Sequence, residues 1–293
     1  MISIIPEGFN DFHCKAGSCR HTCCQTWEID IDEDTADLYR SQPGPLGDDL
    51  RASLETGEDG VTHIRLNEKG FCPLLDQDGL CRVIKELGDE CLSDICAVHP
   101  RFFTELDDYV LCGTGLCCEK SCELLAEQPN PLRFAVEDSD EVLTFPELVA
   151  KAGWEEVPPE LLRFVPRTSR EECAKIIDNL LPTEPIDEAW TQEMLWLREH
   201  LDEVSAAAAA YAKDYPDDLF QKLYQFILYR QLDRAADYGF DAGAEYAEQS
   251  TGYIFLEAAL HGDPLEQARI WSEQIEYDTD NVPLLFREIL EAE

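Results

Sequence analysis

The amino-acid sequence predicts a mainly α-helical protein in two parts. These are a cysteine-rich, loop-dominated amino-terminal metal or cluster domain with a few short strands, and an all-helical carboxy-terminal region. The first observation is that 12 of the 13 cysteines lie between Cys14 and Cys122, whereas only Cys173 follows. The second is the frequent glycine and proline of the first part, which favour short elements. The third is the recurrence of apolar residues at helical spacing in the second part. We therefore expect two domains, at residues 1–130 and 131–293.

Short strands and helices are expected between the cysteines. Apolar and acidic residues alternate over residues 27–32, which is the period-two pattern of a half-buried strand, and residues 61–66 form a second strand candidate. Residues 82–88 have the pattern of a two-turn helix with a glycine at its end. The segment 109–116 is expected to be extended, and a helix is expected to begin near Cys118.

The second part of the chain has the pattern of successive helices with recognisable starts. Thr144 can cap a helix that has Pro146 in its first turn and Gly153 beyond its end. Thr168 and Glu171 have the spacing of a capping box for the next helix. The remaining helices are expected at residues 187–213, 216–236, 242–260, 264–277 and from 282 onward.

The net charge of -39, from 62 acidic against 23 basic residues, argues against a nucleic-acid partner, because such a partner requires a basic face. A field of this sign can attract a basic partner such as a lysine-bearing protein; alternatively, it belongs to a solvated acidic surface that favours solubility. The chain has no apolar run suited to a signal peptide or a membrane span. We expect a cytoplasmic protein with reduced thiols and no membrane partner.

Four thiols within eleven residues, at Cys14, Cys19, Cys23 and Cys24, are the densest feature of the sequence. Two of them are adjacent and the loops between the others are tight, so the four cysteines cannot all form disulfide bonds of ordinary geometry. A metal ion or cluster is therefore expected. Thiolates suit both structural zinc and iron–sulfur clusters, and the spacing leaves both open. The other thiols of this part are Cys72, Cys81, Cys91, Cys96, Cys112, Cys117, Cys118 and Cys122.

Histidines and the common catalytic motifs add little to the cysteine pattern. His21, His63 and His99 can each replace a thiolate as a ligand, although an ordinary surface or core histidine is the commoner explanation for each. The sequence contains no G-x-G-x-x-G after a strand, no P-loop, no H-E-x-x-H and no G-x-S-x-G. If the chain is catalytic, the cysteine site is expected near the centre of the chemistry.

A set of motifs around the cysteines resembles a known family. The first run is Phe12-His13-Cys14, Cys19, Cys23-Cys24, Trp27, Ile29 and Ile31-Asp32, followed by Thr35 and Tyr39. The later motifs are Phe71-Cys72-Pro73-Leu74, Gly79-Leu80-Cys81, Leu87-Gly88, Leu92-Ser93-Asp94-Ile95-Cys96, His99-Pro100-Arg101 and Gly115-Leu116-Cys117-Cys118-Glu119. With these motifs the sequence resembles the flagellin lysine N-methylase family, strongly over residues 12–119 and weakly beyond. The cysteine half is also similar to a wider group of zinc- or iron-chelating domains.

The resemblance implies an S-adenosylmethionine-dependent transfer of a methyl group to lysine side chains of flagellin, with an iron–sulfur cluster in the cysteine domain. It favours a cluster of the 4Fe-4S type, with zinc as the alternative. The sequence lacks the C-x-x-x-C-x-x-C triplet of radical S-adenosylmethionine enzymes, because Thr26 stands where a third thiol would follow Cys23. A radical mechanism of that type is therefore not expected. The candidate ligands are Cys14, Cys19, Cys23, Cys24, Cys72, Cys81, Cys96 and Cys118.

Three further residues are candidates for the chemistry of such an enzyme. Glu119, beside Cys118, is the candidate carboxylate for removing the proton of the lysine amine. Arg101 and Arg230 can hold the carboxylate of the methyl donor by bidentate contacts, or can form salt bridges in so acidic a protein. The alternative function is a non-catalytic zinc- or iron-binding module, such as a chaperone, a redox sensor or a scaffold, which would not bind S-adenosylmethionine.

Overall fold

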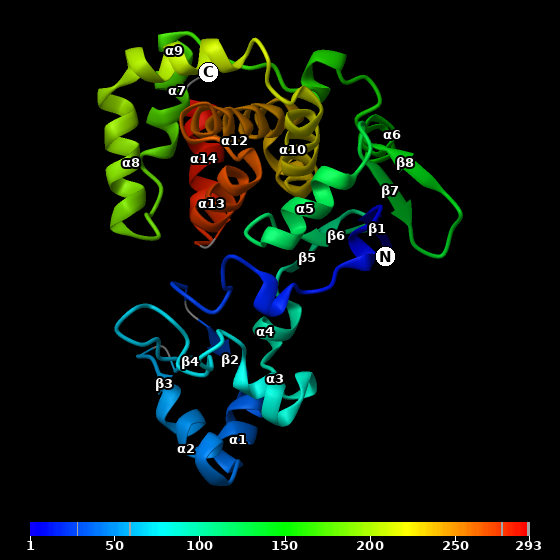
Figure 1. Ribbon diagram of the computed structural model, residues 1–293. Coiled ribbons are helices and arrows are strands. Elements are labelled where there is room, and N and C mark those ends of the chain that lie inside the picture. Colours follow the sequence, from blue (N-terminus) through cyan, green and yellow to red (C-terminus); the bar gives the residue numbers. More distant parts are fainter. Residues whose placement is uncertain (28, 59, 277, 292–293) are drawn as a thin grey trace. The chain divides into compact units, whose positions relative to one another are not determined.

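The contacts of the chain divide it into two compact units in the computed structural model (Figure 1). Unit 2 is the continuous segment His13–Arg101, and unit 1 comprises Met1–Phe12 and Phe102–Glu293. The structure describes residues 1–27, 29–58, 60–276 and 278–291. These residues form fourteen α-helices and eight short strands, which confirms the predicted mainly helical fold class. The domain boundary predicted at residue 130 falls inside unit 1 and stays a prediction.

Unit 2 is built from short helices and a small sheet around a core of its own. Its helices are α1 (Glu33–Ser41), α2 (Gly44–Ser53), α3 (Arg82–Leu87) and α4 (Asp94–Val98). Its antiparallel sheet has the order β2 (Asp30–Ile31), β4 (Thr62–Ile64) and β3 (Leu54–Thr56). The side chains of Tyr39, Leu50 and Val83 fill the core. The predicted strands and the helix at residue 82 are therefore present, although residue 28 of the first predicted strand lies outside the described residues.

Unit 1 contains a five-stranded sheet whose central strand comes from the start of the chain. The order is β5 (Arg101–Leu106), β6 (Tyr109–Thr114), β1 (Ile2–Pro6), β7 (Arg133–Val136) and β8 (Val142–Thr144). Ile4 of β1 pairs with Leu111 in the parallel direction and with Val136 in the antiparallel direction. The two strands after residue 131 were not expected from the sequence, because they are only three or four residues long and adjoin a well-capped helix.

The helices of unit 1 follow one another along the chain with short connections. They are α5 (Glu119–Glu127), α6 (Phe145–Lys151), α7 (Arg170–Leu180), α8 (Glu188–Glu199), α9 (Leu201–Tyr211), α10 (Asp217–Arg230), α11 (Leu232–Tyr238), α12 (Phe240–His261), α13 (Pro264–Glu276) and α14 (Asn281–Glu291). Within the described ranges, no helix combines the length and the apolar composition that crossing a bilayer requires. Residue 277, where the predicted helix 264–277 ends, is not among the described residues.

Helix α12 is the centre of unit 1, and Figure 1 shows it enclosed by α10, α13 and α14. Of its 22 residues 17 are buried, so this helix is covered on nearly every side rather than along one stripe. Helix α10 joins the helices to the sheet. The hydroxyl of Tyr229 on α10 lies 2.7 Å from the carbonyl oxygen of Ile4 and 2.8 Å from that of Cys112, so it can donate a hydrogen bond to either strand.

Three sequence expectations about the helices were wrong in detail. The predicted helix 187–213 is two helices, because His200 leaves the helical conformation and its ring stacks on Trp196 at 4.5 Å. The predicted helix 216–236 is likewise interrupted at Gln231. The capping box of α7 is formed by Ser169 and Glu172, one residue later than predicted, and the Ser169 side chain accepts a hydrogen bond from the Glu172 amide.

Candidate functional site

Four of the predicted ligand thiols gather in unit 2, although they come from four separate segments. Cys24 and Cys72 lie on neighbouring strand-like segments, where the amide of Cys72 donates a hydrogen bond of 2.8 Å to the carbonyl oxygen of Cys24. Cys81 precedes α3, and Cys96 lies on α4. All four side chains pack on the core of unit 2. The fold of unit 2 therefore concentrates thiols that the sequence separates by as many as 72 residues (24 to 96).

The electrostatics of this four-thiol group disfavour its ionisation as long as the negative charges are not compensated. Burial raises the pKa of the Cys72 thiol to about 12, and the charges of Cys24, Cys81 and Cys96 add to this rise. Burial likewise raises the pKa of Cys81 and of Cys96. Cys24 differs, because a hydrogen bond from the Cys23 side chain lowers its pKa to about 7 against the effect of burial. A cationic metal group compensates such a set, so the donor chemistry fits a thiolate-bound metal or cluster.

The sulfur atoms of this group are spread too widely for a single zinc ion in this arrangement. Tetrahedral zinc with Zn–S bonds near 2.3 Å brings its ligand sulfurs to about 3.8 Å from one another. Among the described cysteines, no three sulfur atoms lie within 4.8 Å of one another. An iron–sulfur cluster places several of its own atoms between the ligands and therefore holds them further apart. The thiols are therefore gathered on one core without being preformed around a single zinc ion.

Neighbouring side chains hold the segments that carry Cys24 and Cys96. The indole nitrogen of Trp27 donates a hydrogen bond of 2.7 Å to the carbonyl oxygen of Cys23, and the Trp27 ring meets the edge of His99 at 5.0 Å. Burial lowers the pKa of His99 to about 4, so its imidazole is neutral near pH 7. Asp32 caps α1 and also accepts a 3.0 Å hydrogen bond from the first amide of α4. These contacts fix the loop before Cys24 and the helix that carries Cys96.

The other predicted site residues lie outside the four-thiol group. Cys14 and Cys23 are exposed and Cys19 is half-buried, all in the opening loop of unit 2. Cys118 and Glu119 start helix α5 in unit 1, where Glu119 is buried. A thiol that is missing from the predicted ligand set, Cys91, packs on the same core as the four thiols, and its carbonyl oxygen accepts a hydrogen bond from Tyr39. Arg101 is the last residue of unit 2.

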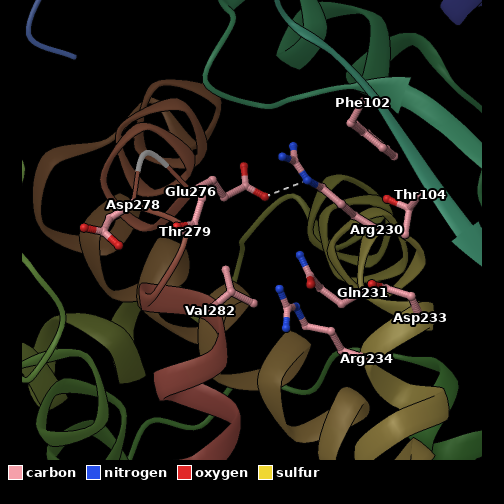
Figure 2. Close-up of a pocket in the computed structure, with 10 residues that line it drawn as sticks. All are labelled: Phe102, Thr104, Arg230, Gln231, Asp233, Arg234, Glu276, Asp278, Thr279 and Val282. Atoms are coloured by element: carbon pink, nitrogen blue, oxygen red, sulfur yellow. Dashed lines mark ion pairs between the residues drawn. The ribbon is translucent and has the colours of Figure 1, made fainter. Parts of the chain in front are cut away.

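A charged pocket of about 210 Å³ lies in unit 1, where strand β5 meets the ends of α10, α11 and α13 (Figure 2). Arg230 and Arg234 point into it from one side, and Glu276 comes from the other. Asp233 also lines the pocket, and burial raises the pKa of its carboxyl. The sequence analysis identified only Arg230 among these residues. The available signal was the occurrence of two scarce cations, Arg230 and Arg234, within five residues, although the end of α10 separates them.

Arg230 is held in the pocket by several contacts, but one of its nitrogen atoms has no hydrogen-bond partner among the described residues. Its Nε lies 2.9 Å from Oε1 of Glu276, and its guanidinium carbon lies 4.7 Å from the centre of the Phe102 ring. Its buried Nη1 has no hydrogen-bond partner among the described residues. Phe102 can reach this position because residue 113 is glycine, where a Cβ atom would lie 2.6 Å from the ring. Arg230 therefore forms the predicted salt bridge and keeps a donor available for an anion.

Taken together, these observations describe a cysteine-rich, mainly helical protein in which four thiols pack on one core. The chain is 29% identical over 132 residues to the lysine-N-methylases of Salmonella choleraesuis and Salmonella typhimurium, which corresponds to 43% of this chain and 33% of each relative. It is 28% identical over 132 residues to the flagellar biosynthetic protein FliU of Salmonella muenchen, covering 78% of that protein. These relatives confirm the resemblance seen in the cysteine motifs. The matched region spans about a third of the length of the two methylases. No protein-family model and no solved structure matches the chain.

Proposed function

We propose that this protein is an S-adenosylmethionine-dependent protein lysine N-methyltransferase that acts on a flagellin-type substrate and carries an iron–sulfur cluster. The observation that carries the proposal is the four-thiol group of unit 2, in which Cys24, Cys72, Cys81 and Cys96 converge on one core. The names of the related proteins support the reaction, and the gathering of four thiols on one core supports a bound metal group. The net charge of -39 suits a substrate that presents lysines.

The four thiols would hold the cluster, because they pack on one core. When bound, an iron–sulfur cluster supplies a redox-active and Lewis-acidic iron centre. The protein contributes the partial burial of the thiols and the hydrogen bond that favours the Cys24 thiolate. Trp27 contributes by holding the Cys23 carbonyl and hence the loop that presents Cys24.

The pocket of unit 1 is the proposed site for the charged end of the methyl donor. Arg230 offers its unpartnered Nη1 to a carboxylate, and Arg234 adds a second positive charge. The volume of about 210 Å³ is below the roughly 300–1,000 Å³ of pockets that enclose a drug-sized ligand, so we assign only the amino-acid end of the donor to it. Arg101 was also predicted for this role, but it belongs to unit 2 and does not line the pocket.

Methyl transfer to lysine requires a neutral amine, so a nearby group must accept the ammonium proton. The pocket offers Asp233, whose burial raises its pKa and so makes it a better base than an exposed aspartate. Glu119, the residue predicted for this role, is buried at the start of α5 and does not line the pocket. We therefore propose Asp233 as the first carboxylate to test and Glu119 as the second.

Replacement of Cys72 and Cys96 by serine is expected to abolish both bound iron and methyl transfer. The native protein, purified without oxygen, should contain iron and acid-labile sulfide and should transfer labelled methyl groups to lysines of flagellin. Cys173→Ala is the matched control, because Cys173 is a buried thiol of helix α7 in unit 1. It should leave the iron content unchanged.

Two outcomes would contradict the proposal in distinguishable ways. Iron and sulfide without any transfer to a lysine-bearing protein would exclude the methyltransferase reaction but keep the cluster. Zinc without iron, together with no calorimetric signal for S-adenosylmethionine, would instead establish a non-catalytic metal-binding module.

A further inference from the structure

Three metal-ligating side chains converge in unit 1 on helices α8 and α12. Glu193, Glu257 and His261 each offer one ligand atom, and these atoms all lie within 4.8 Å of one another. Nε2 of His261 lies 3.3 Å from Oε1 of Glu193 and 3.7 Å from Oε2 of Glu257. In the described part of the chain this is the only group of three histidine, cysteine, aspartate or glutamate residues gathered so closely.

The buried carboxylate of Glu257 points to a ligand independently of this clustering. Its side chain is only 6% exposed, and its Oε1 is buried without a hydrogen-bond partner in the described structure. Glu193 is a second carboxyl group close to it, so the group brings two carboxyl groups and one imidazole together. A buried carboxylate oxygen without a donor is unfavourable unless a cation compensates it. A metal cation bound between the three side chains would supply this compensation.

The three residues are carried by two regular helices. Glu257 and His261 are four residues apart on α12, so they share one face of the helix and lie one turn apart. Glu193 approaches from α8, and Trp190 of α8 packs on Tyr253 of α12 at 5.2 Å between ring centres. This aromatic contact lies one turn before the ligands on each helix and holds the two helices together. The three side chains are thus presented by packed helices rather than by a loop.

We propose that Glu193, Glu257 and His261 bind a divalent transition-metal ion of the Mn²⁺, Fe²⁺ or Zn²⁺ class. Two carboxylates and one imidazole form a mixed oxygen and nitrogen donor set, which suits these ions. Three protein ligands leave coordination positions for water or for a small anionic ligand. The side chains of Glu193 and His261 are 34% and 48% exposed, so solvent reaches these open positions. The site is separate from the four-thiol group and does not depend on the proposed methyltransferase function.

Titration of the full-length protein with Mn²⁺, followed by electron paramagnetic resonance of the free ion, tests the proposal. Mn²⁺ is the probe because it prefers oxygen ligands, whereas thiolates prefer softer ions. Salt near 0.15 M suppresses weak binding to the acidic surface. The native protein should bind one Mn²⁺ tightly, and Glu257→Gln should weaken this binding by more than about tenfold. Removal of a residue that only supports a metal ligand already costs about tenfold or more in affinity, and removal of a ligand should cost at least as much.

Glu248→Gln is the matched control, because Glu248 is also a buried glutamate of α12 but lies outside the group. This variant should bind one Mn²⁺ as tightly as the native protein does. His261→Gln is a second test variant at a half-exposed position, which keeps the test valid if Glu257→Gln does not fold. Mn²⁺ should raise the unfolding midpoint of the native protein but not that of either test variant. Equal tight binding by the native protein and by the folded test variants, or no tight ion in the native protein, would overturn the proposal.

Discussion

Arg230 forms a salt bridge through one part of its guanidinium and leaves another part unused. The sequence suggested either an anion-binding arginine or a salt bridge. In the structure Nε forms the salt bridge with Glu276, the face of the guanidinium packs on Phe102, and Nη1 has no hydrogen-bond partner among the described residues. Because the salt bridge holds the guanidinium in place, little conformational entropy is lost when an anion binds.

Arg230→Gln is expected to weaken binding of S-adenosylmethionine by roughly tenfold or more, because a charge-assisted contact contributes about 1.5–3 kcal/mol. Calorimetric titration of the native protein and the variant measures this loss. Arg198→Gln is the control, since Arg198 forms only a surface ion pair with Asp178 at 2.5 Å. Unchanged affinity in Arg230→Gln would remove the pocket from the proposed cofactor site.

Two glutamates on helix α12 should respond to pH with opposite signs. Burial raises the pKa of Glu248 to about 7, whereas hydrogen bonds from Arg167, Gln249 and Lys175 overcome burial and lower the pKa of Glu245 to about 2. A carboxyl with a raised pKa in the folded state binds its proton there more tightly than in the unfolded chain. Its contribution to stability is therefore lost as the pH rises from about 4.3, its usual unfolded value, to about 7.

Glu248→Gln should therefore remove part of this loss, so the variant gains stability relative to the native protein between pH 5 and pH 8. The paired variant Glu245→Gln should do the reverse, because a carboxyl with a lowered pKa stabilises the folded state above its unfolded pKa and loses this effect as the pH falls toward about 2. Urea unfolding at several pH values measures both. Parallel pH profiles for the two variants would contradict the assignment.

At the scale of elements, the start of α7 depends on one hydroxyl. Two overlapping S/T-x-x-E patterns begin at Thr168 and Ser169, and both have the correct spacing. The structure uses Ser169, whose Oγ lies 3.3 Å from the amide of Glu172 while Glu172 accepts a hydrogen bond of 2.9 Å from the Ser169 amide. Local pattern alone cannot choose between the two starts, because both pairs have the spacing of a capping box.

Ser169→Ala should lower the free energy of unfolding by about 1 kcal/mol, the usual cost of removing a helix cap. Thr168→Ala is the matched control one residue away. It should change the free energy by much less, because the hydroxyl of Thr168 does not cap the helix. Denaturant unfolding of both variants distinguishes the two starts, and a larger loss for Thr168→Ala would favour the start predicted from the sequence.

Across the whole molecule, the net charge of -39 should make stability strongly dependent on salt. Raising the ionic strength from about 0.01 M to about 0.15 M shortens the Debye length from roughly 30 Å to roughly 8 Å and screens the repulsion among acidic side chains. The thermal midpoint should rise over this range. A non-ionic solute at equal osmolality is the control, and a midpoint that falls with salt would show that ion pairs outweigh the repulsion.

The sequence predicted the local features of the molecule better than its long-range features. The helix at Arg82 and the cap at Thr144 are as expected, because capping and glycine signals are local. The cysteine pattern indicated a metal-type site, but it could not select Cys24 and its three partners from twelve thiols, since their convergence depends on how strands and helices of unit 2 pack. The pocket around Arg230 could not be predicted from the sequence for the same reason. Glu276, which lines it, lies 46 residues further along the chain (276 − 230).

Unit 1 is built from two stretches of the chain with unit 2 between them, and this has a consequence for folding during synthesis on the ribosome. Unit 2 is continuous, so all of its residues are available as soon as Arg101 has left the ribosome. Strand β1 precedes unit 2 in the chain, yet its partners β6 and β7 come more than a hundred residues after it, and Tyr229 later still. Because domains fold as units during translation, we expect the thiol-bearing unit to fold on the nascent chain before unit 1 is complete. Ile2–Pro6 would wait unpaired until the sheet of unit 1 closes around it.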